Sequence, residues 1–108
     1  MLMIRAIIRG EKLTDVVQEL NLAGFPSVTK IDVGGRGQQK GFIYGDVLYD
    51  ETPKEMLLII ASDEDKEKII NIIMKIAKTG EKGAFGDGKI FVSPVKEAYT
   101  ISSNSKGL

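Results

Sequence analysis

Two glycine-rich segments of this chain hold the residues that are best suited to bind an anion. The first, GGRGQQKG at residues 34–41, places four glycines around Arg36, Gln38, Gln39 and Lys40. Backbone amides can approach an anion closely where side chains are absent, while Gln39 offers an amide oxygen and Lys40 a point charge. The segment therefore suits a phosphate or a carboxylate. A solvated, flexible hinge is the simpler alternative, because glycine clusters are common in loops.

The second segment is GDGK at residues 86–89, directly before a stretch with the pattern of a strand. Asp87 and Gly88 favour a tight turn, so a turn without a ligand is one explanation. The alternative is an anion-binding turn, in which amides near Gly86 and Gly88 and the ammonium group of Lys89 hold phosphates. Neither segment matches the P-loop pattern or the dinucleotide-binding fingerprint. Two such loops in one small chain favour an anionic ligand more strongly than either loop alone.

Two other charged features are weaker candidates. Lys54 follows Pro53 where the long segment after residue 34 returns to a strand, and it is either a carboxylate ligand or an ordinary solvated lysine. The acidic run from Asp63 to Asp65 lies at the start of a predicted helix, where carboxylates stabilise the positive end of the helix dipole. We therefore expect this run to cap a helix, not to bind a metal.

The composition of the chain argues against several classes of function. Fifteen basic residues balance fifteen acidic ones, so the net positive field that draws proteins to nucleic acid is missing. Cysteine and histidine are both absent, which removes thiolate chemistry, cysteine-ligated metals and the commonest acid–base group near neutral pH. No apolar run approaches the roughly 20 residues that span a bilayer. We expect a cytoplasmic binding protein without nucleic-acid binding or membrane insertion, and an enzyme is a weak alternative.

Apolar periodicity predicts the elements that would position these segments. Alternation with a period of two predicts strands, and apolar residues three and four apart predict helices. The predicted strands are residues 2–9, 28–33, 54–61 and 89–92, followed by an extended run that ends near residue 101. The predicted helices are residues 11–23 and, after a capping box formed by Ser62 and Asp65, a helix that ends near residue 79.

The order of these elements predicts the fold class. Strand, helix, strand, long loop, strand, helix, strand is the order of an α+β, ferredoxin-like βαββαβ fold, with both helices on one face of the sheet. A chain of 108 residues is expected to form a single domain, 1–108. Residues 36–53 are predicted to be a projecting loop or β-arm between the second and third strands, and residues 102–108 a flexible tail.

Three segments, taken in order, resemble the nitrogen-regulatory PII family. They are GFPSVTKIDVGGRGQQKG at 24–41, TPKEMLLII at 52–60, and residues 79–101, which contain GDGKIFVSPVKEAYTI. The resemblance covers nearly the whole chain. The segments KGFIYGDVLYDETPKEM and FVSPVKEAYTI are similar to the NifI branch, the paired PII-like regulators of nitrogenase, and within it to the first member of the pair.

The resemblance implies a trimer, or a hetero-oligomer with a paralogous PII-like subunit, with ATP or ADP bound in the clefts between subunits. Carried over by position, the adenine and ribose pocket consists of Ile7, Thr29, Gly35 and Ile60. The phosphates are approached from the loop by Gly37, Gln39 and Lys40, and from the other side by Gly86, Asp87, Gly88 and Lys89. Gln39 would also reach Mg²⁺. Together with Lys54 and the amides from Gly37 to Gly41, it would bind 2-oxoglutarate.

The chain departs from the family pattern at several positions. Gln38, Thr100 and Ser102 stand where family members often carry arginine, so we expect weaker binding of a triphosphate. The projecting loop is shorter than in the uridylylated members and lacks their YRG motif. The segment Glu81–Phe85 adds residues before GDGK, which would change how the nucleotide site closes.

The function implied by the resemblance is that of a nitrogen-status signal protein. It would inhibit nitrogenase by direct binding, and 2-oxoglutarate would relieve the inhibition by restraining the base of the projecting loop. A PII-like regulator of another target, such as an ammonium transporter or glutamine synthetase, is the alternative.

Overall fold

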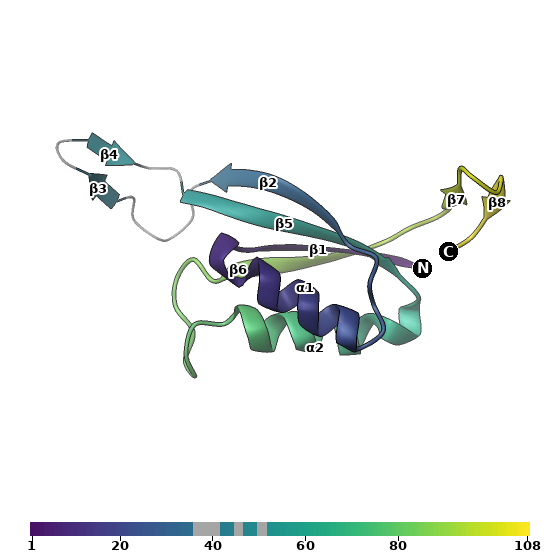
Figure 1. Cartoon of the computed structure of the whole chain (residues 1–108), viewed down its shortest axis with the longest axis horizontal. Coiled ribbons are helices and arrows are strands. Elements are labelled where there is room, and N and C mark those ends of the chain that lie inside the picture. The colour runs from purple at the N-terminus through teal and green to yellow at the C-terminus, as the bar shows by residue number, and fades with distance from the viewer. Residues whose placement is uncertain (36–41, 45–46, 50–51) are drawn as a thin grey trace.

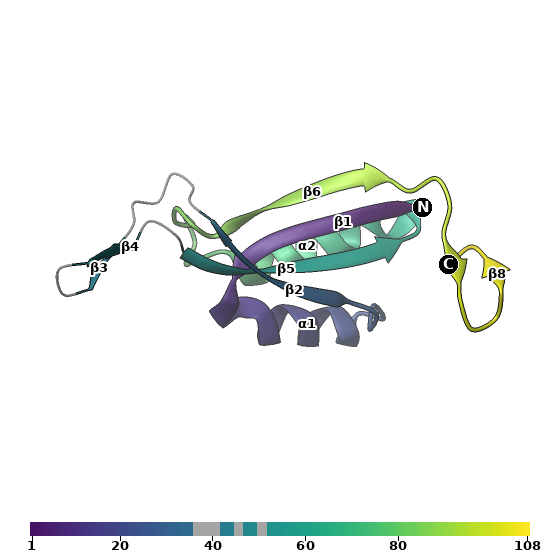
Figure 2. The ribbon, with the colours of Figure 1, turned by 90° about the horizontal axis from the view of Figure 1, so that it is seen from above.

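Four antiparallel strands form the main sheet of the protein, in the order β2-β5-β1-β6 (Figures 1 and 2). The computed structural model describes residues 1–35, 42–44, 47–49 and 52–108. The strands are β1 (Leu2–Arg9), β2 (Thr29–Gly35), β5 (Thr52–Ala61) and β6 (Gly88–Pro94). The central pair, β1 and β5, is in register from Leu2 opposite Ala61 to Arg9 opposite Lys54. This strand order and the two crossover helices confirm the predicted α+β arrangement of ferredoxin-like type.

Both helices, α1 (Leu13–Leu22) and α2 (Lys66–Ala77), cover the same face of this sheet, as Figure 1 shows. Alternate residues of the central strands point toward them, because side chains alternate between the two faces of a strand. The helices contribute the apolar stripe that the sequence predicts. The buried core consists of Ile4, Ala6, Ile8, Val16, Leu20, Leu57, Ile59, Ala61, Ile69, Ile73 and Ala77.

The opposite face of the sheet carries apolar residues around a charged residue, Arg5, which lies opposite Leu58 and Phe91, and no element within the described residues covers it. Ile31 and Phe91 are 41% and 50% exposed on this face. The register places Met3, Ile7, Met56, Leu58 and Ile60 on the same face. We call this surface, made of these seven residues, the open sheet face.

Both helices begin differently from the prediction, through short 3₁₀ turns at Gly10–Lys12 and Asp63–Asp65. The predicted capping box was wrong, because the Ser62 side chain makes no capping hydrogen bond. Instead the Asp65 amide donates to the Ser62 carbonyl at 3.0 Å, so the backbone bond of the tighter turn replaces the side-chain cap. Asp63 pairs with the amino group of Met1 at 2.7 Å.

The segment between β2 and β5 contains a separate two-stranded sheet of β3 (Phe42–Tyr44) and β4 (Val47–Tyr49). Their backbones pair from Phe42 opposite Tyr49 to Tyr44 opposite Val47. In Figure 1 this pair lies beyond the ends of β2 and β5. Of the two alternatives for this segment, the β-arm is therefore the one that the described residues show.

The C-terminal segment also pairs with itself. β6 ends at Pro94, and β7 (Tyr99–Thr100) pairs with β8 (Ser105–Lys106). The extended run predicted to reach residue 101 is thus interrupted, and part of the predicted loose tail is paired. The turn uses left-handed backbone at Asn104, with φ 53°, and at Gly107, with φ 111°. None of the helices described is both long and apolar enough to cross a membrane.

Candidate functional site

The candidate site lies at the end of the sheet where β1 stops and β5 and β6 begin. Antiparallel pairing brings Arg9, the last residue of β1, directly opposite Lys54 near the start of β5. On the other side of β1, Ile8 pairs with Gly88, the first residue of β6. The strand ends therefore gather Arg9, Lys54 and the segment 86–89, which are far apart in the sequence.

Asp87 fastens the loop that leads into β6. Its carboxylate accepts hydrogen bonds from the Thr79 hydroxyl at 2.6 Å, the Thr79 amide at 3.0 Å, the Ala84 amide at 2.8 Å and Nε of Arg9 at 3.2 Å. The bonds from Thr79, assisted by those from Ala84 and Arg9, hold the pKa of Asp87 well below its usual range. This carboxylate is occupied by donors of its own chain, so its side chain organises the loop.

Two cations of the sheet hold the same loop by its carbonyl groups. Nη2 of Arg9 donates to the Phe85 carbonyl at 2.7 Å. Nζ of Lys54 donates to the Gly86 carbonyl. Burial and the neighbouring charge of Arg9 hold the pKa of Lys54 below its usual value. Arg9 is neutralised by Asp87, whereas the carbonyl partner of Lys54 carries no net charge.

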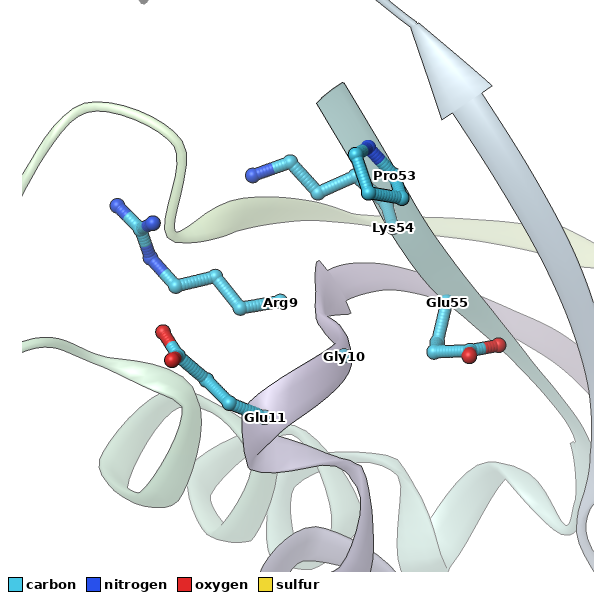
Figure 3. A pocket seen from close by; sticks show the side chains of 6 residues that line it. All are labelled: Arg9, Gly10, Glu11, Pro53, Lys54 and Glu55. Atoms are coloured by element: carbon cyan, nitrogen blue, oxygen red, sulfur yellow. The ribbon is translucent and has the colours of Figure 1, made fainter. Parts of the chain in front are cut away.

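A cavity of about 310 Å³ lies beside these cations, lined by Arg9, Gly10, Glu11, Pro53, Lys54 and Glu55. In Figure 3 the charged ends of Arg9 and Lys54 point to the same side, toward the loop before β6. Glu55 points the other way, because neighbouring residues of a strand face opposite sides of the sheet. The cavity is thus bordered by two adjacent cations and by the Glu11 carboxylate, which lies on the Arg9 side in Figure 3, so Lys54 is the cation better placed to bind a carboxylate.

The turn before β6 differs from the predicted one. The Asp87 amide donates to the Ala84 carbonyl at 3.2 Å, so the turn is centred on Phe85 and Gly86 and not on Asp87 and Gly88. Gly86 occupies the left-handed region, with φ 93°. Asp87 closes this turn through its amide, while its side chain binds Thr79 and Ala84.

Gly88 is required by a close backbone approach. Its φ is 115°, and a Cβ atom at this position would lie 1.7 Å from the Ile7 carbonyl oxygen. A side chain would therefore separate β6 from β1 at the first rung of their pairing. Next to it, Lys89 pairs with Ile7 on the open sheet face.

The remaining site predictions divide into two groups at opposite ends of the sheet. Gly35 ends β2 near Lys54, whereas Thr29 begins the same strand. Seven residues at about 3.3 Å each separate the two ends of β2 by roughly 20 Å. Ile60 lies with Thr29 beside a second cavity of about 640 Å³, which the C-terminal residues Tyr99 and Thr100 also line.

One chain therefore unites Ile7, Lys54 and residues 86–89 but not Thr29 or Ile60. The other site predictions, Gly37, Gln39, Lys40 and Gly41, lie outside the described residues.

Arg9 and Thr79 belong to this arrangement although sequence reasoning did not select them. Alternation places Arg9 on the same face as Ile7, which was the available signal, but its position opposite Lys54 depends on the strand register. Apart from the place of Thr79 before Gly80, nothing in the sequence marked it as a site residue, because Thr79 meets its partner Asp87 only in the folded loop.

The similarity to known proteins extends over nearly the whole chain. Residues 1–105 match the family model for Nitrogen regulatory protein P-II. The chain is 51% identical over 108 residues to "Nitrogen fixation nifHD region GlnB-like protein 1" of Methanothermobacter marburgensis, and 53% identical over 108 residues to the protein of the same name in Methanobacterium ivanovii. Both alignments cover 100% of each chain.

A relative named "protein 2" is more distant. "Nitrogen fixation nifHD region glnB-like protein 2" of Methanococcus maripaludis is 36% identical over 117 residues, covering 94% of this chain and 93% of that protein. The chain thus groups with the relatives named protein 1, as the resemblance to the first member of the pair indicated. The family regulates and does not catalyse, which confirms the prediction that this protein is not an enzyme. The chain belongs to the nitrogen regulatory protein P-II family.

Proposed function

We propose that this protein signals nitrogen status in the cytoplasm by binding ATP or ADP, Mg²⁺ and 2-oxoglutarate, and that it inhibits nitrogenase by direct contact when 2-oxoglutarate is scarce. Family membership supports the regulatory role, and the names of its relatives associate them with nitrogen fixation and the nifHD region. The observation that carries the proposal is the pair of adjacent cations, Arg9 and Lys54, beside a cavity at the root of the β3–β4 arm.

The cations favour a dicarboxylate as the effector. Lys54 is partly buried and its present partner, the Gly86 carbonyl, is uncharged, so a carboxylate would gain a stronger, charge-assisted bond. Gln39, which precedes the arm, would complete the site through its amide oxygen and through Mg²⁺ held on the nucleotide. A ligand bridging Lys54 and Gln39 would restrain both ends of the segment that carries β3 and β4.

The nucleotide would bind between copies of the chain. Of the residues carried over to the nucleotide site, Gly35 and Thr29 lie at opposite ends of β2, roughly 20 Å apart, and Ile60 lines the same cavity as Thr29, so residues of two chains would complete one site. Association through the open sheet face would bury its apolar residues and bring unlike ends together. We propose a trimer, or a hetero-oligomer with a paralogue of the type named protein 2.

Calorimetric titration tests the effector part of this proposal. We expect 2-oxoglutarate to bind only in the presence of ATP and Mg²⁺, and the Gln39→Ala variant to lose this binding. Gln38→Ala is the matched control, because it removes the same side chain one position away and should retain binding. Binding of 2-oxoglutarate to Gln39→Ala with unchanged affinity would contradict the assigned site.

A nitrogenase activity assay tests the target. The purified protein, with its paralogue where both are needed, should inhibit nitrogenase, and 2-oxoglutarate should relieve the inhibition. Inhibition by Gln39→Ala should persist in the presence of 2-oxoglutarate. No inhibition by either the single protein or the pair would instead favour another nitrogen-metabolism target, such as an ammonium transporter or glutamine synthetase.

A further inference from the structure

The loop from Thr79 to Asp87 is attached to the sheet by two anchors of different chemistry. The first, at Arg9, is the ion pair with Asp87 at 3.2 Å together with a hydrogen bond from Nη2 of Arg9 to the Phe85 carbonyl at 2.7 Å. The second is the single hydrogen bond from Lys54 to the Gly86 carbonyl. The first anchor joins opposite charges and the second joins a charge to a neutral group.

An anion entering beside these residues would affect the two anchors unequally. Arg9 already has a carboxylate partner, so a new carboxylate would have to compete with Asp87 for it. Lys54 would exchange a neutral carbonyl for a charged oxygen, and charge-assisted hydrogen bonds are roughly twice as strong as neutral ones. The Lys54 ammonium has three donors, so the Gly86 carbonyl is lost only when the stronger bond draws the ammonium toward the anion; of the two anchors, this is the one that an anion would release.

We propose that the Lys54–Gly86 contact is a releasable latch, through which a dicarboxylate bound at Lys54 loosens the turn of residues 84–87 while Arg9 and Asp87 keep the loop attached. This inference rests on the proposed binding of 2-oxoglutarate at Lys54. It adds that the effector acts on the loop before β6 as well as on the β3–β4 arm.

The latch has a consequence at the surface. Phe85 lies in the segment 81–85 of this loop, and its side chain is 72% exposed. Its backbone carbonyl is held by Arg9, one residue before the carbonyl that Lys54 holds. Release of Lys54 would thus change the presentation of an exposed aromatic side chain. Because coupling is reciprocal, a partner that stabilises the latched loop would lower the affinity for 2-oxoglutarate.

Amide hydrogen exchange measures the latch directly. The Asp87 amide is bonded within the turn to the Ala84 carbonyl. In Lys54→Met without ligands, we expect this amide to exchange about fivefold faster than in the wild type, the ratio that corresponds to losing one hydrogen bond. Lys30→Met is the matched control, because Lys30 contacts Asp32 and Glu55 and should leave the loop unchanged.

The effect of the ligand is measured at saturating Mg–ATP, with and without 2-oxoglutarate. The wild type should show faster exchange of the Asp87 amide when 2-oxoglutarate is added, and Lys54→Met should show no further change. If the Asp87 amide of ligand-free Lys54→Met exchanges at the wild-type rate, the latch is ruled out, regardless of which ligands the protein binds. If calorimetry shows 2-oxoglutarate binding to the wild type but exchange is equal or slower, the coupling is wrong and the proposed function stands. If 2-oxoglutarate does not bind, both the effector assignment and the coupling are overturned.

Discussion

Arg9 and Lys54 are direct cross-strand partners on β1 and β5, and both hold the loop that precedes β6. Like charges directly opposite each other normally destabilise a sheet. Here Asp87 neutralises Arg9, and two loop carbonyls accept hydrogen bonds from the pair. The two cations thus lie side by side at the edge of a cavity, and their contacts with the loop offset the repulsion between them.

Replacing Asp87 by asparagine should loosen this loop and destabilise the protein. The carboxylate accepts four hydrogen bonds, and a neutral amide would lose the ion pair with Arg9 and place an NH₂ group against donors. We expect the free energy of unfolding to fall by about 1.5–3 kcal/mol, the range for hydrogen bonds to a charged group. Urea denaturation at a fixed protein concentration measures it. Glu81→Gln, which removes a carboxylate from the same loop, should have little effect; an equal loss in that variant would point to net charge and not to Asp87.

The contribution of Asp87 to the free energy of unfolding should decrease as the pH falls. Its pKa in the folded protein lies far below the ordinary value of 3.8, so the folded state favours the ionised form. The stabilisation is therefore complete above about pH 5 and is lost as the pH falls through about 4 toward the folded-state pKa. Urea midpoints of the wild type and Asp87→Asn should differ by a constant amount at neutral pH and converge in acid. A difference that grows on acidification would be incompatible with this carboxylate network.

Gly88→Ala should be among the most damaging single substitutions in the chain. The added Cβ would lie 1.7 Å from the Ile7 carbonyl oxygen, and φ of 115° is unfavourable for alanine. We expect a loss of about 3 kcal/mol or more in the free energy of unfolding, because both strain and the first β1–β6 rung are affected. Thermal or urea unfolding measures it. Gly10→Ala is the control, since its Cβ would meet only Cγ of Glu55 at an ordinary 3.8 Å. Equal stability of the two variants would rule out the close approach of β6 to β1.

Self-association should depend on the open sheet face. Phe91 is 50% exposed at the centre of β6 on this face, directly opposite Arg5, and Phe91→Glu would replace its apolar ring with a charge that an oligomer would have to bury, even where it pairs with Arg5. We expect this variant to shift toward the monomer in analytical ultracentrifugation, with its circular dichroism unchanged. Leu22→Glu introduces the same charge at a residue that is 72% exposed at the end of α1, and it should assemble like the wild type. If Phe91→Glu keeps the assembly of the wild type, the open sheet face is not the interface.

The elements of the fold could be predicted from the sequence because their signals are local. Alternation along β1 separates Ile4, Ala6 and Ile8 from the other face, and that alternation alone identifies the strand and its buried side. The same holds for the stripe of Ile69, Ile73 and Ala77 on α2. The starts of the helices were predicted less well, because a 3₁₀ turn and a side-chain cap satisfy the same backbone groups and the sequence does not distinguish them.

The candidate site was predictable only in part. Lys54 and residues 86–89 were identified by residue type and by resemblance, but the turn was expected at Asp87 and Gly88 and lies at Phe85 and Gly86. The carboxylate of Asp87 binds Thr79 and Ala84 instead of lying in an exposed turn. Such bonds join residues that come close only in the folded loop, so no local sequence pattern predicts them.

The sequence by itself determined the four strands of the main sheet and the two helices, which sides of them are apolar, and which family the chain resembles, since these properties depend on spacing along the chain. Only the tertiary structure decided that Arg9 lies opposite Lys54, that Asp87 binds Arg9 and Thr79, and that Thr29 and Gly35 lie at opposite ends of one strand. The register of antiparallel strands sets these relationships, and it follows from burying the core between the sheet and both helices as a whole.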